Sequence, residues 1–379
     1  MDVVTLKIAT DRSVPRHTRG HAVYYRDEQG RERPVHPSRI AQDGQTMYLY
    51  SAAGRFNFSW NNATGRLWTF PAGTVLFSDG VTPISTSTAQ QPDVIIPAGG
   101  GVVTLQSAAW AGNFTLNDNN TDSGYLGSLA DLPALTYHLD LTNCSLVTGD
   151  LSDLPALTFY LILTNCSLVT GSLADLPAVT NYLILANCNL VTGSLADLPA
   201  LTNFLDLYNC SLVTGSLADL PALTNYLNLY NCSLVTGSLA DLPAVTNFLD
   251  LSNCSLVTGS LADLPALTNY LILANCNLVT GSLADLPALT YHLILTNCSL
   301  VTGAYTAVSG TSVPTTTILT GTGMSATDMD ATLIAYAATT KNGGTFTATG
   351  KTRTAASDAA VTTLTSAPRN WTISGITKV

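Results

Sequence analysis

Eight cysteines recur every 22 residues, and the chain of 379 residues has no others. Thiols in such a row could pair as disulfides, hold a metal or serve as small buried apolar groups. A ladder of identical positions needs the same side-chain setting in every copy, which disfavours pairing, and no His/Cys spacing is typical of zinc. We therefore expect free, inward-facing thiols, and neither a metal nor a cofactor. The cysteines are Cys144, Cys166, Cys188, Cys210, Cys232, Cys254, Cys276 and Cys298.

One aspartate also recurs in each repeat, always before Leu-Pro, from Asp131 to Asp285. A row of carboxylates about 4.8 Å apart repels itself, and calcium would relieve that repulsion. The alternative, which we favour, is that each aspartate caps a one-turn helix through backbone amides. Asn143 and its copies are likewise expected to bond the backbone of a turn rather than a ligand.

The sequence offers little for catalysis. Three of its five histidines, His17, His21 and His36, lie in a basic N-terminal segment, and the other two stand at opposite ends of the repeat block. The chain shows no nucleophile–base pair and no phosphate-binding loop. We expect a non-enzymatic protein without catalytic residues.

Almost all variation between repeats falls around the two leucines of a Leu-x-Leu segment. The positions before, between and after these leucines point outwards from a strand and form three columns. The first column is His138, Tyr160, Tyr182, Phe204, Tyr226, Phe248, Tyr270, His292. The second is Asp140, Ile162, Ile184, Asp206, Asn228, Asp250, Ile272, Ile294. The third is Thr142, Thr164, Ala186, Tyr208, Tyr230, Ser252, Ala274, Thr296.

An aromatic column on a sheet indicates either a binding surface or a stack that stiffens the sheet. We favour a ligand-binding concave face. Its predicted residues are His138, Tyr160, Tyr182, Phe204, Tyr226, Phe248, Tyr270, His292, Asp140, Asp206, Asn228, Asp250, Tyr208 and Tyr230.

A fixed period of 22 residues predicts one supersecondary unit stacked on copies of itself, a parallel solenoid. Leucines repeated in every copy would form its core, with Leu139, Leu141, Cys144 and Leu146 facing inwards in the first repeat. Leu129, Leu132 and Leu135 recur as well, and Val179 and Val245 replace the equivalent of Leu135.

The segment Leu183-Ile-Leu185-Ala-Asn-Cys188-Asn-Leu190 resembles the leucine-rich repeat, and the match recurs eight times over residues 127–302. Residues Met324 to Ser374 resemble the closing repeats of bacterial surface proteins and of phage-tail-associated leucine-rich-repeat proteins. One departure is that Val179 lies four positions before Leu183, where the family has a leucine three before. This spacing predicts a bulge at the strand entrance.

The fold is therefore expected to be mainly β, a leucine-rich-repeat parallel solenoid with helix-containing C-terminal capping coils and a small N-terminal β domain. We predict a docking domain over 1–79, a connector over 80–110, and an N-terminal capping coil over 111–126. Eight repeats follow over 127–303, then divergent coils and a cap over 304–379. Helices are expected to follow Ser325 and to run over 359–364. In the N-terminal domain, residues 56–60 and 66–70 are expected to form a hairpin.

Charge limits the partners. The net charge is −10, and no Lys or Arg occurs from residue 67 to residue 340. Such a solenoid repels phosphate backbones, so we expect no nucleic acid. The chain lacks an apolar run long enough to span a bilayer, so we expect no membrane insertion. Its start lacks a secretory signal pattern, which favours assembly in a cytoplasm.

These observations predict a structural or appendage protein of a phage virion, part of an oligomeric assembly. Residues 1–79 would attach to other virion subunits, and the solenoid would bind a host-surface protein or glycan. The alternative is a bacterial cell-surface adhesin or effector that uses its repeats to bind protein or glycan.

Overall fold

In the computed structural model, the described residues are 128–132, 138–155, 159–177, 181–222, 224–244, 246–265, 269–287, 291–306 and 313–379, together with eight short strands before residue 116. Contacts group the chain into two units, residues 1–158 with 162–169, and residues 159–161 with 170–379. The boundary runs through the second repeat. Within each unit, the repeats form a mainly β parallel solenoid of the leucine-rich-repeat kind.

Each repeat of the second unit makes one coil of four parts. In one coil these are the strand β13 (Tyr182–Ile184), a turn, the strand β14 (Leu190–Thr192) and the short 3-10 helix η6 (Leu195–Asp197). The Leu-x-Leu strand is three residues long, and the left-handed Asn187 soon after it turns the chain away. The pattern repeats in β15 (Phe204–Asp206), β17 (Tyr226–Asn228), β19 (Phe248–Asp250), β21 (Tyr270–Ile272) and β23 (His292–Ile294).

The second strands and the short helices follow the same rhythm. The strands are β16 (Thr214–Ser216), β18 (Leu234–Thr236), β20 (Thr258–Ser260), β22 (Leu278–Ser282) and β24 (Val301–Thr302). The helices are η5 (Leu173–Asp175), η7 (Leu217–Asp219), η8 (Leu239–Asp241), η9 (Leu261–Asp263) and η10 (Leu283–Asp285).

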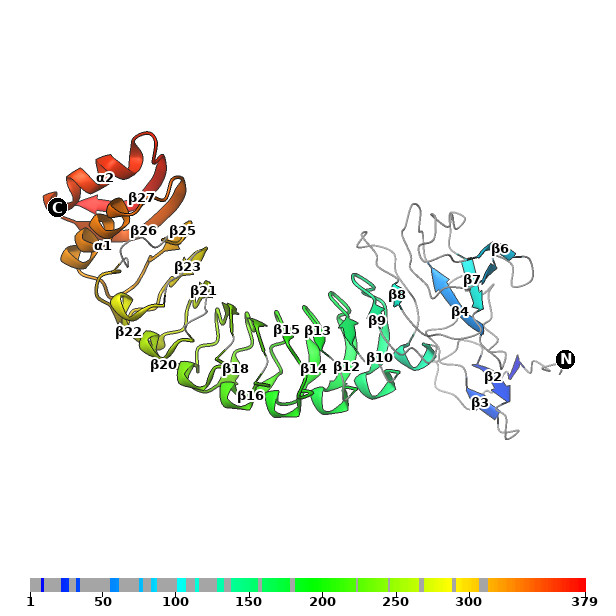
Figure 1. Ribbon diagram of the computed structural model, residues 1–379. Helices are drawn as coiled ribbons and strands as arrows, with labels where there is room; N and C mark the ends of the chain where they lie inside the picture. The colour runs from blue at the N-terminus through cyan, green and yellow to red at the C-terminus, as the bar shows by residue number, and fades with distance from the viewer. Residues whose placement is uncertain are drawn as a thin grey trace. The chain divides into compact units, whose positions relative to one another are not determined.

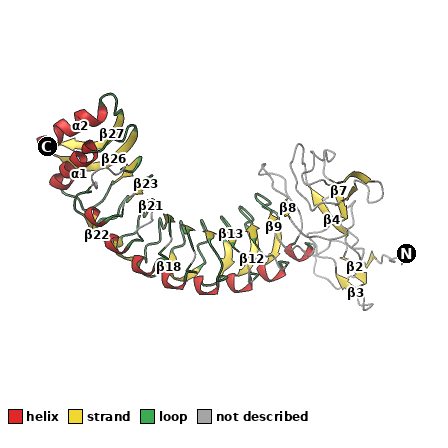
Figure 2. Cartoon of the chain, in the orientation of Figure 1, coloured by secondary structure: helices red, strands yellow, loops and turns green. Residues whose placement is uncertain are grey.

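The Leu-x-Leu strands of the second unit form one parallel sheet in chain order from β13 to β23. Corresponding residues pair without a shift, so Tyr182 lies beside Phe204 and Phe204 beside Tyr226. Within this unit the sheet lies on the concave side and the short helices lie on the convex side (Figures 1 and 2). Residues one repeat apart therefore stand side by side, about 4.8 Å apart.

An asparagine and a glycine make the two tight bends of each coil. Asn187 has φ 63° and Gly193 has φ 107°, in the left-handed region. A side chain at Gly193 would place its Cβ 2.6 Å from the Leu173 nitrogen of the preceding coil. The asparagine side chains bond one another across coils, for example Asn209 Nδ2 donating to Asn187 Oδ1 at 2.7 Å. The sequence predicted that these asparagines bond the backbone of the turn, and the bonds between their side chains were not expected.

The aspartate column caps the short helices, as predicted. Ser194 is the N-cap of η6, and its Oγ accepts the Ala196 N–H. The Asp197 carboxylate accepts the Ser194 N–H at 2.9 Å, which completes a capping box. The same pair of bonds recurs in the other coils of the second unit, so each carboxylate is committed to a backbone amide.

Two leucine columns were placed wrongly. Leu146 is 40% exposed, and its neighbour Val147 is buried instead, because the Asn143 bend shifts the inward position by one residue. In the column of Leu135, the described copy Leu201 is 47% exposed, while Thr202 is buried. Thr202 stands three positions before Leu205, the spacing of the family, so a threonine fills the position of the usual leucine.

The buried threonines stay in the core because their hydroxyls find backbone partners. Thr224 Oγ1 donates to the carbonyl of Pro221 at 2.9 Å and lies 3.2 Å from that of Thr202 in the preceding coil. A buried hydroxyl without such a partner would be costly. The predicted bulge beside Val179 lies outside the described residues. At the described strand entrances two consecutive N–H groups share one carbonyl, since those of Asn203 and Phe204 both donate to Asn181, at 2.9 and 3.2 Å.

In the first unit, β8 (Asn113–Thr115) pairs in parallel with β9 (His138–Asp140), consistent with a capping coil before the repeats. The described parts of the first two repeats are η3 (Leu129–Asp131), β10 (Thr148–Asp150) and η4 (Leu151–Asp153), followed by β11 (Tyr160–Ile162) and β12 (Leu168–Ser172), which cross the unit boundary.

Two antiparallel sheets precede them. β1 (Ile8–Ala9), β2 (Ala22–Arg26) and β3 (Glu32–Pro34) form one. β4 (Arg55–Trp60), β7 (Gly101–Gln106), β5 (Val75–Phe77) and β6 (Pro83–Thr86) form the other, in that order.

The N-terminal sheets differ from one expectation drawn from the sequence, and a second expectation falls outside the described residues. The segment 80–110, expected to be a connector, contributes β6 and β7 to the second sheet, because its Val102-Val103-Thr104-Leu105 run supplies a strand. β4 pairs with β7 over six residues from Arg55 to Trp60. Residues 66–70, the predicted hairpin partner of β4, lie outside the described residues.

The C-terminal coils close the sheet with helices, as predicted. β25 (Thr316–Ile318), β26 (Gly344–Arg353) and β27 (Trp371–Lys378) extend the parallel sheet, and α1 (Ala326–Ala338) and α2 (Asp358–Thr365) lie between them. Ser325 caps α1 through a capping box with Asp328. Tyr336 of α1 is fully buried and bonds Thr317 at 2.7 Å.

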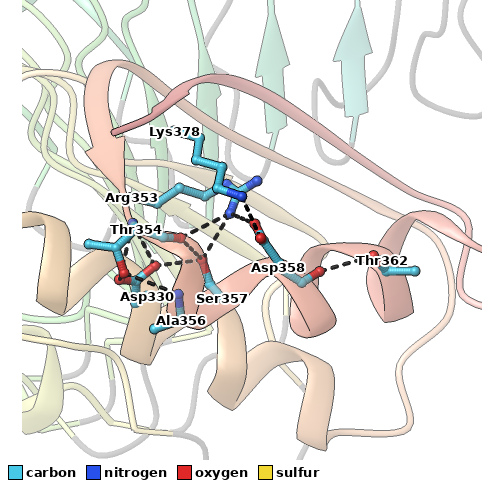
Figure 3. A network of polar contacts seen from close by, with 8 residues as sticks. All are labelled: Asp330, Arg353, Thr354, Ala356, Ser357, Asp358, Thr362 and Lys378. Carbon is cyan, nitrogen blue, oxygen red and sulfur yellow. Dashed lines mark hydrogen bonds and ion pairs between the residues drawn. The ribbon is translucent and has the colours of Figure 1, made fainter.

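A buried carboxylate joins α1 to the start of α2 (Figure 3). Asp330, 4% exposed, accepts hydrogen bonds from Thr354 Oγ1 at 2.6 Å and Ser357 Oγ at 2.5 Å, and from the Thr354 N–H. The short helix η11 (Ala355–Ser357) begins there. Burial opposes ionisation, but these hydrogen bonds and the nearby Arg353 outweigh it and lower the pKa of Asp330.

The register of the coil can be tested with one residue type. Leu205→Asp places an unpaired charge in the core, and we expect it to lower the free energy of unfolding by about 4 kcal/mol or more, or to prevent folding. Leu201→Asp, four residues earlier in the same coil, should change it by less than about 0.5 kcal/mol, because Leu201 is exposed. Thermal unfolding followed by circular dichroism measures both. Equal effects would contradict the assigned register.

Acid should loosen the C-terminal cap. The folded-state pKa of Asp330 lies below the unfolded value of about 4, so its stabilisation is complete above that pH and is lost as pH falls through the folded pKa. We expect Asp330→Asn to cost about 1–3 kcal/mol at pH 7 and to flatten the dependence of the unfolding midpoint on pH below about 4. Asp241→Asn, which keeps an acceptor for its capping amide, is the control.

Candidate binding face on the parallel sheet

The outward side chains of the sheet are those of the three variable columns. In every Leu-x-Leu strand of the second unit the leucine is buried and its two neighbours are partly exposed, as in β17 (Tyr226–Asn228). The third column is less open, because Ala186 and Ser252 are buried. The structure therefore places the predicted site residues of this unit on one face, in consecutive coils.

The first column forms a continuous row of stacked rings, called here the aromatic row. The Phe204 and Tyr226 centroids lie 3.9 Å apart at 7°, and those of Tyr226 and Phe248 lie 4.2 Å apart at 9°. Towards each end the rings tilt, by 31° between Tyr160 and Tyr182 and by 38° between Phe248 and Tyr270. The row consists of Tyr160, Tyr182, Phe204, Tyr226, Phe248, Tyr270 and His292.

Stacking determines what the aromatic row presents. The faces of the central rings cover one another, so a ligand there meets ring edges and the Tyr226 hydroxyl rather than open faces. A sugar that stacks flat on a ring therefore finds no free face on Phe204, Tyr226 or Phe248. The stiffening role and the binding role, which were alternatives, are compatible in this geometry. Tyr208 and Tyr230 form a second, shorter stack at 4.6 Å and 10° in the third column.

Between the two stacks, three polar residues occupy consecutive coils. We call Asp206, Asn228 and Asp250 the acidic centre. Ile184 precedes it in the column, and Ile272 and Ile294 follow. One oxygen of each polar side chain accepts the backbone N–H two residues on, at 3.0 Å from Tyr208 to Asp206, 3.2 Å from Tyr230 to Asn228, and 2.9 Å from Ser252 to Asp250. The side chains are thereby oriented by their own strands.

The acidic centre is electrostatically strained. Burial raises the pKa of Asp206, against hydrogen bonds from Tyr208 and Asn228, and the Asp250 charge raises it further. Burial also raises the pKa of Asp250, opposed by the hydrogen bonds of Ser252. Burial and then the two carboxylates raise the pKa of Tyr226 to about 12. A hydrogen-bond donor or a cation brought by a ligand would relieve the two carboxylates.

Two of the predicted site residues lie in the first unit rather than in the second. Asp140 Oδ1 accepts the Thr142 N–H at 2.9 Å and its hydroxyl at 2.6 Å, the local bond seen in the acidic centre. Burial lowers the pKa of His138, with Asp140 acting in the opposite direction. These two residues show that the column geometry is already present in the first described coil.

Two aromatic residues extend the face and were missing from the predicted site. Phe159 packs edge-on against Tyr160 at 4.7 Å, and Tyr291, 46% exposed, stacks on Tyr270 at 4.9 Å and 12°. Both belong to the position just before the aromatic column, where the middle coils carry asparagine. The change from aromatic to asparagine within that column was the available signal.

The cysteines lie on the other side of the strands, inside the coils. All eight are buried, and none forms a disulfide. In the second unit the Sγ atoms donate to carbonyls of the preceding coil, such as Cys210 to Leu185 at 3.1 Å and Cys254 to Leu229 at 3.1 Å. Burial raises the pKa of Cys254 and Cys298 to about 12.

Two features are absent from the described part of the chain. No three His, Cys, Asp or Glu side chains there are grouped closely enough to hold a metal ion. Among the same residues no helix has the length and apolar character needed to cross a bilayer. The face thus offers hydrogen-bond acceptors, ring edges and hydroxyls.

Comparison with known proteins adds no relative. No family model, no curated protein and no solved structure matches the chain. The assignment as a leucine-rich-repeat-like solenoid therefore rests on the repeat and its geometry.

The thiols provide a direct test of the inward side. At about pH 8 a thiol reagent such as dithionitrobenzoate should modify none of the eight cysteines in the native protein, because all eight are buried. All eight should react in denaturant. Rapid native labelling, or a mass showing paired cysteines, would contradict the cysteine ladder.

Proposed function

We propose that the protein is a non-enzymatic binding protein whose sheet face in the second unit holds a ligand. The observation that carries this proposal is the confinement of sequence variation to the outward columns of the sheet, while the core, the turns and the capping boxes repeat almost unchanged. Stability alone calls for one good residue at each repeated position. Different residues in successive coils suit a surface that matches a ligand without the same period.

The chemistry of the face supports a ligand rich in hydrogen-bond donors. Two carboxylates of raised pKa stand about 10 Å apart, two coils of the sheet, with the Asn228 amide between them. The repeats carry no Lys or Arg to neutralise these carboxylates. Sugar hydroxyls, or the Lys and Arg side chains of a protein, supply donors of the needed kind. Ring edges on both sides would contribute apolar contact.

We further propose that this binding serves attachment to a host surface, with the protein as an appendage of a phage virion. Residues 1–79 would dock to other virion subunits, and the solenoid would meet a host protein or glycan. The resemblance of residues 324–374 to closing repeats of bacterial surface proteins and of phage-tail-associated proteins suits this setting and the alternative equally. A bacterial surface adhesin or effector is the second candidate. Purified particles that contain the chain, with residues 1–79 shielded from protease, would favour the first.

Ligand binding should depend on the acidic centre and the aromatic row. We expect Asp206→Asn combined with Asp250→Asn to weaken binding about 10-fold or more, because charge-assisted hydrogen bonds are lost. Replacing Tyr182, Phe204, Tyr226 and Phe248 by Ser should abolish it. The measurement is retention of the labelled protein on a glycan array and on candidate host cells.

Two matched controls separate binding from folding. Asn228 shows that an amide keeps the local backbone bond of this column, so Asp206→Asn and Asp250→Asn should leave the thermal unfolding midpoint unchanged. Asp175, Asp197 and Asp219 replaced by Asn should preserve binding, because the asparagine Oδ1 can still accept the N–H of the N-cap serine. The variant with three aspartates replaced is compared with the variant with four aromatic residues replaced. If the aspartate variant loses binding and the aromatic variant retains it, the functional face is the convex side of the coil.

A further inference from the structure

A second surface of the solenoid is exposed, apolar and invariant. The leucine after each Asn-Cys-x is 44–50% exposed in six consecutive coils of the second unit. In β14 (Leu190–Thr192) and β18 (Leu234–Thr236), the leucine and the threonine two positions later share the outward side, around a buried valine. We call this surface the leucine–threonine stripe. It consists of Leu190, Leu212, Leu234, Leu256, Leu278 and Leu300 with Thr192, Thr214, Thr236, Thr258 and Thr280.

The threonines add to its apolar character. Thr214 Oγ1 donates to the Gly193 carbonyl of the preceding coil at 3.1 Å, and Thr236 Oγ1 donates to that of Gly215 at 3.2 Å. The same bond recurs at Thr192, Thr258 and Thr280. With the hydroxyl bonded to the coil itself, the methyl group is the part of the side chain available to a partner.

Leucines and threonines of successive coils also lie next to each other. Thr214 pairs with Leu234, and Thr258 pairs with Leu278, in the parallel ladder of the second strands. The two columns therefore form one continuous strip without a charged residue. Apolar patches of this extent on a protein surface mark interaction sites.

We propose that the leucine–threonine stripe is a dimer interface that binds the same stripe of a second copy of this chain. The period argues for this occupant. The stripe repeats with every coil, so a partner that contacts all its leucines must present groups at the same spacing, which a second copy does. A two-fold interface requires a self-complementary patch, and a strip of identical coils meets this condition in either direction.

The area of the stripe agrees with a second copy, and its lack of charge limits the repulsion between two acidic chains. Six half-exposed leucines and five threonines offer on the order of 600 Å². The serines and asparagines beside the leucines would bring each side near the ~800 Å² per partner of a standard interface. The chain carries a net charge of −10, so two copies repel each other. An uncharged strip is the surface through which they can approach most closely.

The first test is the mass of the full chain in solution by light scattering. We expect twice 39.7 kDa at micromolar concentration, and a dimer that tightens when salt is added, because salt screens the repulsion of two acidic chains. Leu234→Lys combined with Leu256→Lys should raise the dimer Kd by about 100-fold or more. Leu201→Lys is the control, since Leu201 is equally exposed but lies off the stripe.

Mixing then tests the contact itself. Leu234→Glu combined with Leu256→Glu should also give monomers, and an equal mixture of the Lys and Glu variants should recover dimers. As a measurement independent of these charges, Leu234→Cys should be joined to a second copy by a short bismaleimide, because the native thiols are buried. Ala240→Cys, exposed on the short helix of the same coil, should not be joined.

Three results would overturn the proposal. These are a single-copy mass at every concentration, an unchanged wild-type mass in the Lys variant, and equal crosslinking at positions 234 and 240. Association through another face would give the second of these results, and a stripe that serves only a different protein would give the first. None of these measurements uses the ligand of the sheet face, so the dimer and the proposed function succeed or fail separately.

Discussion

The hydrogen bonds between successive coils are the constraint on which the structure depends. In the sheet, the Leu185 N–H donates to the Asp206 carbonyl at 2.9 Å, and the Leu207 N–H donates to the Asn228 carbonyl at 2.9 Å. Such bonds bring equivalent residues of neighbouring coils side by side at the strand spacing. Inside the coil, each side chain then lies beside the equivalent side chain of the next repeat. A residue type is acceptable inside the coil only if it packs well against itself.

The inward and turn residues meet this condition in different ways. Asparagine has both a donor and an acceptor, so Asn231 Nδ2 donates to Asn209 Oδ1 at 2.7 Å and a ladder of amides forms. A thiol donates to a carbonyl of the preceding coil instead, and buried threonine does the same with its hydroxyl. A carboxylate cannot bond its own copy, so each Asp of the short helices bonds the N-cap amide. The same residue recurs at each of these positions because its bonding partners in the coil recur.

Sequence reasoning identified the elements well, because a fixed period states which residues are neighbours. The strand leucines, the free cysteines, the capping aspartates and both C-terminal helices were predicted. It failed at Leu146 and at the Leu135 column, where leucine was assumed to be buried by its type. The left-handed Asn143 shifts the inward position to Val147, and the intercoil hydrogen bonds allow Thr202 to replace a leucine. Neither effect can be read from hydrophobicity, since both are set by backbone bends and by partners in another coil.

The same reasoning explains why the two outer surfaces differ. On the leucine–threonine stripe the columns are invariant, although exposure alone would let Leu234 or Leu256 change freely. On the sheet face the acidic centre interrupts an isoleucine column with Asp206, Asn228 and Asp250, although burial and the Asp250 charge raise the pKa of Asp206. Neither the exposed leucines nor the acidic interruption belongs to the buried core of the coil. An invariant exposed leucine suits a partner with the period of the solenoid, whereas a local acidic interruption suits a ligand that meets only a few coils. We therefore propose the first surface for a copy of the chain and the second for a different molecule.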